Sequence, residues 1–133
     1  MSLTPEIREF LSQPRFAVLG TLNADGSVQQ TVMWYLLQGD SILMNTNTAR
    51  TKFRNLNSNP RVSVCVSDGY TYVTLQGDAT LDQDRKTSQA DIARIAHHYV
   101  SHQEFEKTYR KGFEDADRVS IRIPIDRVIN HGV

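Results

Sequence analysis

The chain has 133 residues, and its 15 Lys and Arg side chains balance 15 Asp and Glu side chains, so the formal net charge is zero. This length fits a single domain over residues 1–133, since a domain usually takes about 100–200 residues. The balanced charge excludes a broadly basic protein built to bind nucleic acid, because that binding depends on a basic surface. No apolar run approaches the ~20 residues that span a bilayer, and the charged N-terminus lacks a secretory pattern, so we expect a cytoplasmic protein that does not act in a membrane.

The first half of the chain predicts a short helix followed by strands. Thr4-Pro5-Glu6 is typical of a helix start, and Pro14 ends that helix. Asn23-Ala24-Asp25-Gly26-Ser27 is a strong hairpin signal between two extended runs. Tight turns between consecutive strands predict an antiparallel meander, because parallel pairing needs long crossovers. Strands are expected over residues 16–22, 28–37 and 41–46.

The second half alternates between helical and extended patterns. Residues 61–67 alternate strictly, which predicts a half-buried strand with Val62, Val64 and Val66 on one face. Gly77 interrupts a later strand and predicts a bulge or a bend of the barrel. Helices are expected over residues 49–56, 84–99 and 103–111, and further strands over 70–81, 119–125 and 127–129. The sum is a mainly β protein of six or seven antiparallel strands with two or three peripheral helices. Closure into a barrel removes exposed sheet edges.

The segment from Asn45 to Leu56 carries the clearest chemical signal. A strand end leads into a helix whose first turn holds Arg50, Thr51 and Lys52. Helix N-termini normally favour acidic residues, so cations there indicate a bound anion, most simply a phosphate. Arg offers a fork of donors and Lys a point charge for such a group. The alternative interpretation is a solvated basic helix face, and the local pattern leaves both open.

Two adjacent aromatic residues, Trp34 and Tyr35, must point to opposite faces of the strand that holds them. One of them could stack on a planar ligand or line a subunit interface, although ordinary core packing is the simpler interpretation. His98 and His102 are four residues apart but lack a third ligand, so no metal site is predicted. Cys65 lies in the alternating strand and is interpreted as a packed, inert thiol.

Motifs for nucleophilic catalysis, for a phosphate loop and for a dinucleotide fold are missing from the sequence. An anion site and an aromatic strand without a catalytic triad suit a protein whose cofactor performs the chemistry.

The ordered series Asp-Gly-x-x-Gln, Met-Trp-Tyr, Lys-x-x-Asn-Leu and Asn-Pro-Arg-Val-Ser resembles the pyridoxamine 5'-phosphate oxidase-like flavoproteins. Within that family the chain is most similar to the short F420-dependent (deazaflavin) oxidoreductases, and the resemblance runs from about Pro5 to the C-terminal Ile-Pro-Ile-Asp-Arg-Val. The resemblance implies a split β-barrel, a homodimer with the cofactor in a groove between subunits, and hydride transfer from reduced coenzyme F420 to an electron-poor small molecule.

The resemblance also assigns residues to the cofactor. The strand beside the ring system, the strand end near the ribityl chain or phosphate, the phosphate turn, and a polar group from the partner subunit follow in that order along the chain. The matching residues are Gln30, Thr31, Val32, Met33, Trp34 and Tyr35; Asn45 and Thr46; Arg50, Thr51 and Lys52; and Tyr72. No side chain stands out as an acid, and Tyr35 or a bound water is the expected proton source.

Two departures from the vitamin oxidases argue against oxidation of pyridoxamine phosphate. Gln30 stands where a basic residue is common, and the tail from Asp126 to His131 lacks the Arg-x-His pair that holds the substrate phosphate. Two alternatives remain beside the F420 enzyme. One is an FMN-dependent oxidoreductase, and the other is a non-catalytic carrier of a flavin, haem or tetrapyrrole.

Overall fold

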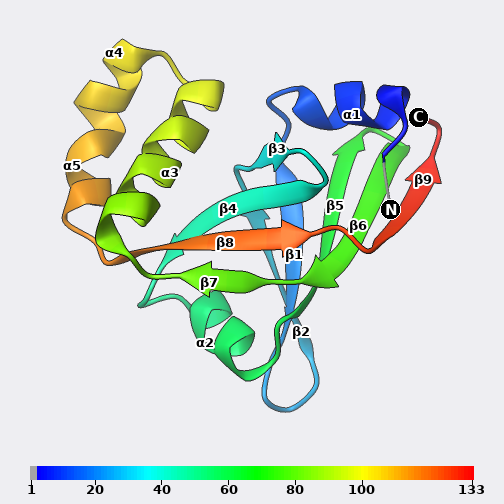
Figure 1. Ribbon diagram of the computed structural model, residues 1–133, viewed down its shortest axis with the longest axis horizontal. Coiled ribbons are helices and arrows are strands. Elements are labelled where there is room, and N and C mark those ends of the chain that lie inside the picture. Colours follow the sequence, from blue (N-terminus) through cyan, green and yellow to red (C-terminus); the bar gives the residue numbers. More distant parts are fainter. Residues whose placement is uncertain (1–2) are drawn as a thin grey trace.

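The computed structural model describes residues 3–133 (Figure 1). Its first element, α1 (Pro5–Ser12), confirms the predicted helix start. The Thr4 hydroxyl accepts a hydrogen bond from the Ile7 N–H at 3.2 Å, which satisfies one free donor of the first turn. Ile7 and Leu11 are buried, so the apolar side of this short helix contributes to the core.

Five strands form the larger sheet, in the order β2-β1-β5-β6-β9, and all neighbours are antiparallel. These strands are β1 (Ala17–Leu22), β2 (Val28–Met33), β5 (Arg61–Asp68), β6 (Thr71–Asp78) and β9 (Arg127–His131). The predicted hairpin joins β1 to β2, and Gly26 in its turn has a φ of 87°, which favours a residue without a Cβ. Val62, Val64 and Val66 are buried as the alternation predicts, so one face of this sheet packs on the core.

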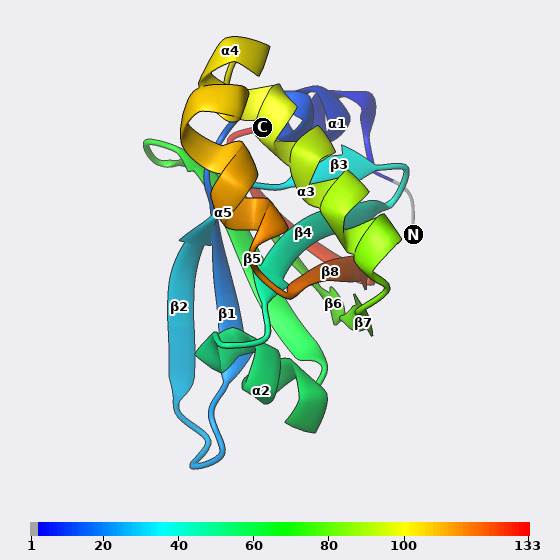
Figure 2. The ribbon, with the colours of Figure 1, turned by 90° about the vertical axis from the view of Figure 1, so that its left-hand side faces the viewer.

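Four strands form the second sheet, in the order β3-β4-β8-β7, again antiparallel. They are β3 (Leu36–Gln38), β4 (Ser41–Asn47), β8 (Arg118–Pro124) and β7 (Thr80–Asp82). Three consecutive residues of β4, Ile42, Leu43 and Met44, are fully buried, so this strand is covered on both faces. Helix α3 (Arg85–Tyr99) packs against β4 and β8 from one side, and the core lies on the other (Figure 2).

The predicted meander is wrong in its second strand. The strand expected over 28–37 is broken at Trp34 and Tyr35, where the chain leaves the larger sheet and enters the smaller one. β1 therefore pairs with β2 and β5, while β4 pairs with β3 and β8. The physical reason is the packing of Tyr35, whose ring is 1% exposed and whose hydroxyl donates to the Leu11 carbonyl at 2.7 Å. Anchoring that ring in the core turns the chain out of the first sheet.

The expected bend at Gly77 lies elsewhere. Gly77 is inside β6, and the chain changes sheet two residues later, at Ala79, whose N–H donates to the Pro60 carbonyl at 2.8 Å. A Cβ on Gly77 would lie 2.2 Å from the carbonyl oxygen of Pro124 in β8. Glycine is needed there because β6 and β8 approach each other closely, where the two sheets meet.

Helices surround the sheets. Helix α2 (Thr51–Ser58) follows β4 and confirms the helix predicted over 49–56. Asp84 is the N-cap residue of helix α3, and its carboxylate accepts from the Thr87 N–H at 3.0 Å. Within residues 3–133 no helix is long and apolar enough to cross a membrane. The weaker helix expected over 103–111 is an irregular helical run beside α3. The run consists of α4 (His102–Glu104), the π-helical turn η1 (Phe105–Tyr109) and α5 (Arg110–Glu114).

The described residues thus form nine strands, three helices (α1, α2 and α3) and the irregular helical run of α4, η1 and α5, where six or seven strands and two or three helices were expected. The strand count differs because two predicted runs are each divided where the chain passes between sheets, as β2 and β3 and as β6 and β7. The fold class is confirmed: a mainly β, antiparallel split barrel with helices outside it.

Candidate functional site

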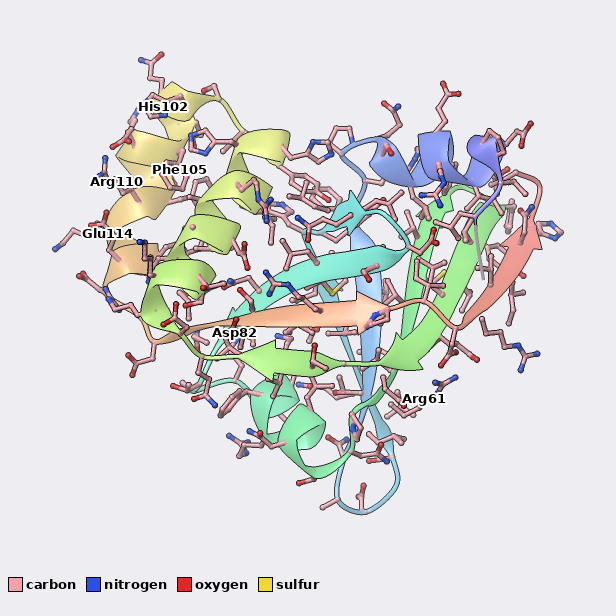
Figure 3. All side chains as sticks on the ribbon, viewed as in Figure 1. Arg61, Asp82, His102, Phe105, Arg110 and Glu114 are labelled. Carbon is pink, nitrogen blue, oxygen red and sulfur yellow. The ribbon has the colours of Figure 1, made fainter. Side chains whose placement is uncertain are left out.

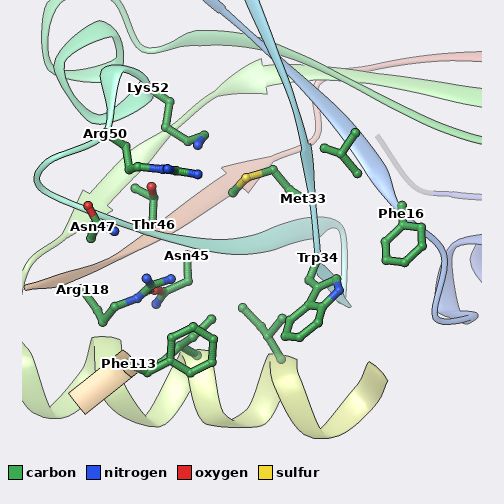
Figure 4. Close-up of a pocket in the computed structure, with 13 residues that line it drawn as sticks. Phe16, Met33, Trp34, Asn45, Thr46, Asn47, Arg50, Lys52, Phe113 and Arg118 are labelled. Atoms are coloured by element: carbon green, nitrogen blue, oxygen red, sulfur yellow. Dashed lines mark hydrogen bonds between the residues drawn. The ribbon is translucent and has the colours of Figure 1, made fainter. Parts of the chain in front are cut away.

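A cavity of about 290 Å³ lies where the end of β2, the end of β4, the start of α2 and the helices α3 and α5 converge. Figure 4 shows cationic side chains at one end of this cavity and aromatic side chains toward the other. The lining residues are Phe16, Val32, Met33, Trp34, Asn45, Thr46, Asn47, Arg50, Lys52, Ile92, Ile95, Phe113 and Arg118.

Three cations converge at the polar end: Arg50, Lys52 and Arg118 (Figure 4). Arg50 is the N-cap residue of α2, and Lys52 in the first turn is only 3% exposed. Arg118 opens β8, and its Nε donates to Asn45 Oδ1 at 2.8 Å while its guanidinium lies 4.9 Å from the Phe113 ring centre. Within residues 3–133, none of the three forms an ion pair with a carboxylate.

Burial and neighbouring positive charge lower the pKa of two of these three cations, Lys52 and Arg118. Burial lowers the pKa of Lys52, and the neighbouring charges of Arg50 and Arg118 lower it further. Burial, followed by the charge of Arg50, lowers the pKa of Arg118 to about 10. A bound anion would relieve both effects, so the electrostatics of this end of the cavity favour a negatively charged ligand.

Uncharged polar groups at the end of β4 complete the polar end. The buried side chains of Asn45 and Thr46 lie beside Asn47 on consecutive positions. Asn45 is fixed from both ends, because its amide nitrogen donates to the Ser88 carbonyl at 3.0 Å and its oxygen accepts from Arg118. The strand end therefore holds Arg118 in place as well as lining the cavity.

The other end of the cavity is apolar and aromatic, with Met33 and Trp34 from the sheet crossover and Phe16 just before β1. The Trp34 ring stacks on Tyr99, with centroids 5.2 Å apart and planes at 9°. Tyr109 meets the same indole edge-on, at 5.2 Å and 61°. Trp34 is thus held between two rings and presents the rest of its surface to the cavity.

The structure brings together seven of the twelve residues expected at the cofactor: Val32, Met33, Trp34, Asn45, Thr46, Arg50 and Lys52 all line the cavity. It separates the others from it. Thr51 accepts a hydrogen bond from Arg54 at 3.2 Å on the helix surface. Thr31 is half-buried and pairs with Leu19 in the larger sheet. Gln30 lines a different groove on the outer face of that sheet, and Tyr72 stacks on His131 in β9 at 5.2 Å.

Tyr35 does not lie at the cavity, and this corrects its assignment as a proton donor. Its ring is in the core, and its hydroxyl is committed to the Leu11 carbonyl. Burial raises the pKa of that hydroxyl, because the charged phenolate would be poorly solvated. The position of this side chain gives no route for a proton to a ligand in the cavity.

Two further sequence interpretations change in detail. His102 stacks on His97 rather than sharing a face with His98, and a ring nitrogen of each lies 3.0 Å from the other. Cys65 is half-buried and lines the outer groove that also contains Gln30, so it faces away from the core.

Two other arginines, Arg61 and Arg110, are neutralised by ion pairs away from the cavity. Arg61 donates to Asp126 at 2.6 and 3.0 Å and lies away from the cavity (Figure 3). On the outer helices, Arg110 pairs with Glu106 and Glu114, and Figure 3 shows Arg110 and Glu114 on the outer side of that run. By contrast, the three cations at the polar end of the cavity have no carboxylate partner within residues 3–133, so their charges are available to a ligand.

Sequence reasoning missed six lining residues: Phe16, Asn47, Ile92, Ile95, Phe113 and Arg118. Arg118 is the most important of these residues, because it is the third cation of the site. Only the three-dimensional fold brings it there. It is paired with Asn47 across β4 and β8, which are joined only by a long stretch of chain. Asn47, by contrast, was within reach of local reasoning, because it belongs to the polar run that precedes Arg50.

The chain thus belongs to the class of antiparallel split barrels, and its cavity combines a cationic end with an aromatic end. The sequence profile of the pyridoxamine 5'-phosphate oxidase family matches residues 3–132, so the chain belongs to that family. No curated protein sequence matches it significantly.

Solved structures share the fold. An F420 reductase superposes with a TM-score of 0.76 at 24% identity, covering 93% of this chain and 96% of that one. The conserved hypothetical protein Rv2991 from Mycobacterium tuberculosis gives 0.78 at 24% identity, with 96% and 83% covered. The heme storage protein HutZ from Vibrio cholerae gives 0.74 at 20% identity, with 99% and 96% covered.

Proposed function

We propose that this chain is an oxidoreductase that uses reduced coenzyme F420 to transfer a hydride to an electron-poor small molecule. The observation that carries the proposal is the cavity itself, in which three unpaired cations lie at one end and an indole-lined apolar wall at the other. A ligand that satisfies both ends has a phosphate on one side and a planar ring system on the other.

The residues present fit such a cofactor. The Lys52 side chain is largely buried, its ammonium has no acceptor among residues 3–133, and a phosphate oxygen in the cavity would supply one. Arg50 and Arg118 would hold the same group with their guanidinium forks. Met33 and Trp34 would orient the ring, while Ile92 and Phe113 exclude water from it. When bound, the reduced cofactor supplies the hydride, and the protein supplies binding and orientation.

The family membership and the F420 reductase among the structural neighbours support an F420 enzyme. FMN is the alternative cofactor, since its phosphate and ring would meet the same two ends of the cavity. A haem carrier is the second alternative, because HutZ shares the fold. The cavity lining favours a flavin-like cofactor over haem: among its residues Met33 is the sole side chain with a soft donor atom, and no histidine or cysteine belongs to it.

Because Tyr35 is committed to the core, we propose that a water molecule delivers the proton that completes reduction of the acceptor. Asn47 and Arg50 line the cavity and would hold such a water by hydrogen bonds. The acceptor would approach the face of the cofactor ring that Trp34 leaves free.

The chain's single tryptophan, Trp34, makes the choice of cofactor measurable. Titration of the purified protein with F420, FMN and haem in parallel, followed by Trp34 fluorescence, is expected to show saturable quenching by F420. Oxidation of the reduced cofactor by a conjugated enone, followed by absorbance, then separates an enzyme from a carrier. Tight FMN binding without a response to F420 would replace the cofactor proposed here, and binding without turnover would favour the carrier.

We also propose that the working unit is a homodimer formed through the outer face of the larger sheet. Three apolar side chains at this side of the molecule are largely exposed: Phe16 at 61%, Val28 at 58% and Val32 at 68%. Phe16 and Val32 also line the cavity mouth, so the exposed patch is continuous with the site. A second copy seated there would cover the cavity, and it would bring the outward-facing Gln30 and Tyr72 of one copy toward the other's cofactor.

The substitution Val32→Asp is expected to convert the dimer to a monomer, because it places a charge in the apolar centre of an interface that must bury about 1,200 Å² or more. Sedimentation velocity measures the change, and cofactor affinity should fall with it. The control is Thr80→Asp, at an exposed position of the edge strand β7 in the other sheet, which should leave the dimer intact. A wild-type protein that sediments as a monomer at all concentrations would contradict the proposal.

A further inference from the structure

The chain crosses from the larger sheet to the smaller one at Trp34 and Tyr35. The backbone N–H and C=O groups of this crossover cannot form hydrogen bonds with a neighbouring strand. β2 ends at Met33 and β3 begins at Leu36, so Trp34 and Tyr35 belong to neither sheet. Tyr35 is nevertheless buried, and a buried N–H without a partner is costly. The fold must therefore supply a hydrogen-bond partner at this point from another element.

The last residue of α3, Tyr99, supplies that partner. Its hydroxyl oxygen accepts the Tyr35 N–H at 3.1 Å. The same hydroxyl donates its proton to the Arg15 carbonyl at 2.5 Å, and the Tyr35 carbonyl lies 3.2 Å away as a second acceptor. One hydroxyl group thus joins the end of a helix, the segment before β1 and the sheet crossover.

The ring of Tyr99 adds a second constraint on the crossover. It lies between Phe16 and Trp34, nearly parallel to both, at centroid distances of 6.0 and 5.2 Å and angles of 11° and 9°. Phe16 and Trp34 line the cavity, whereas Tyr99 does not. Tyr99 therefore stands behind the aromatic wall and fixes the plane of the two rings that form it.

We infer that Tyr99 is a positioning residue for the cofactor ring, because its hydroxyl fixes the backbone of the crossover and its ring fixes the plane of Trp34. The consequence for the ligand rests on the proposed function, but the effect on Trp34 does not. A planar ring stacks well only against an indole held at a defined angle, and the peptide bond that Tyr99 holds through the Tyr35 N–H is the one that joins Trp34 to Tyr35.

The test compares Tyr99→Phe with two matched hydroxyl deletions. Tyr109→Phe keeps the edge-on ring against Trp34 and removes a hydroxyl that makes no side-chain hydrogen bond within residues 3–133. Tyr35→Phe removes the buried hydroxyl that binds Leu11, so it is expected to lower thermal stability without moving Trp34. Near-UV circular dichroism at the long-wavelength edge, where the indole absorbs and phenol rings do not, reports on the single tryptophan, and titrations with F420 and FMN report on binding.

Tyr99→Phe is expected to reduce the long-wavelength near-UV signal of Trp34 and to weaken cofactor binding by about tenfold, which corresponds to about 1.4 kcal/mol of binding free energy. Tyr109→Phe should change neither quantity, and Tyr35→Phe should change only the melting temperature. Equal losses in Tyr99→Phe and Tyr109→Phe, or an unchanged Trp34 signal in Tyr99→Phe, would overturn the inference.

Two further readouts keep the test decisive. Amide hydrogen exchange in the wild-type protein needs no variant: the Tyr35 N–H should be protected like the amides of a strand, and rapid exchange would contradict its bond to Tyr99. If the wild type binds neither F420 nor FMN, the proposed function fails. The near-UV and exchange measurements then still decide whether Tyr99 positions Trp34.

Discussion

The substitution Lys52→Met is expected to weaken cofactor binding by about 100-fold, which is the upper range for the loss of one charge-assisted hydrogen bond. Lys52 is the most buried of the three cations, and methionine has a similar length without the charge. Arg50 and Arg118 remain to hold the phosphate, so binding should be weakened strongly and not abolished.

The same substitution is expected to stabilise the protein without cofactor. The Lys52 ammonium is buried beside two like charges and has no carboxylate partner in residues 3–133, which is unfavourable in the folded state. Replacing a buried charge with an apolar side chain of similar size commonly gains free energy, here about 1 kcal/mol. That corresponds to a rise in melting temperature of about 4 °C for a chain of this length.

The pH dependence of both effects follows from the lowered pKa of Lys52. Cofactor affinity should be highest below this pKa and should fall as pH rises through it, because the neutral amine no longer attracts the phosphate. The apo-protein should behave in the opposite way. Between the lowered pKa of the folded state and the ordinary value of 10.5, the unfolded chain binds more protons than the folded one, so stability increases with pH. Lys52→Met should lose the part of both dependences that Lys52 contributes and keep the part that comes from the lowered pKa of Arg118.

Thermal unfolding with and without F420, together with binding titrations across pH, measures these changes. The control is Lys86→Met, because Lys86 is an exposed residue in the first turn of α3 and should affect neither binding nor stability. A variant at position 52 that loses stability in proportion to its loss of binding would show that Lys52 serves the fold.

The anion site was predictable because its signal is local. Arg50 and Lys52 lie two residues apart at a helix start, and a strand end places them together whatever the rest of the fold does. The third cation, Arg118, joins them through the pairing of β4 with β8, in which Asn47 is opposite Arg118. A pairing between segments so far apart depends on the whole core, and no local pattern around Arg118 indicates it.

The aromatic end of the cavity was likewise predictable only in part from the local sequence. Trp34 was identified as a residue that could face a ligand, but the alternation rule that placed Trp34 and Tyr35 on opposite faces assumed one continuous strand. The chain leaves the larger sheet at these two residues, so Tyr35 enters the core and becomes unavailable to a ligand. Phe113, which closes the cavity from α5, lies beyond the helix expected over 103–111 and received no prediction. Its role depends on how the helices fold back over the smaller sheet.

The substitution Gly77→Ala is expected to cost about 3 kcal/mol of the free energy of unfolding, at the upper end of the range for overpacked positions. The added Cβ would lie 2.2 Å from the carbonyl oxygen of Pro124 and 3.1 Å from the Cγ2 of Ile123. Both neighbours belong to β8, and a backbone oxygen inside a sheet cannot rotate away as a side chain can. The contact is also where β6 and β8 bring the two sheets together, so relief would require the split barrel to open and would displace β8, which carries Arg118.

The matched control is Gly20→Ala, in β1 of the same larger sheet. A Cβ there would lie 3.5 Å from the Ser63 carbonyl oxygen and from a Val28 methyl, which is ordinary van der Waals contact. Gly20→Ala should therefore leave denaturant unfolding nearly unchanged, or stabilise the protein slightly by restricting the unfolded chain. Chemical denaturation measured for both variants separates a steric requirement at Gly77 from a general preference for glycine in this sheet. Equal stability of the two variants would show that β6 and β8 are not in close contact at Gly77.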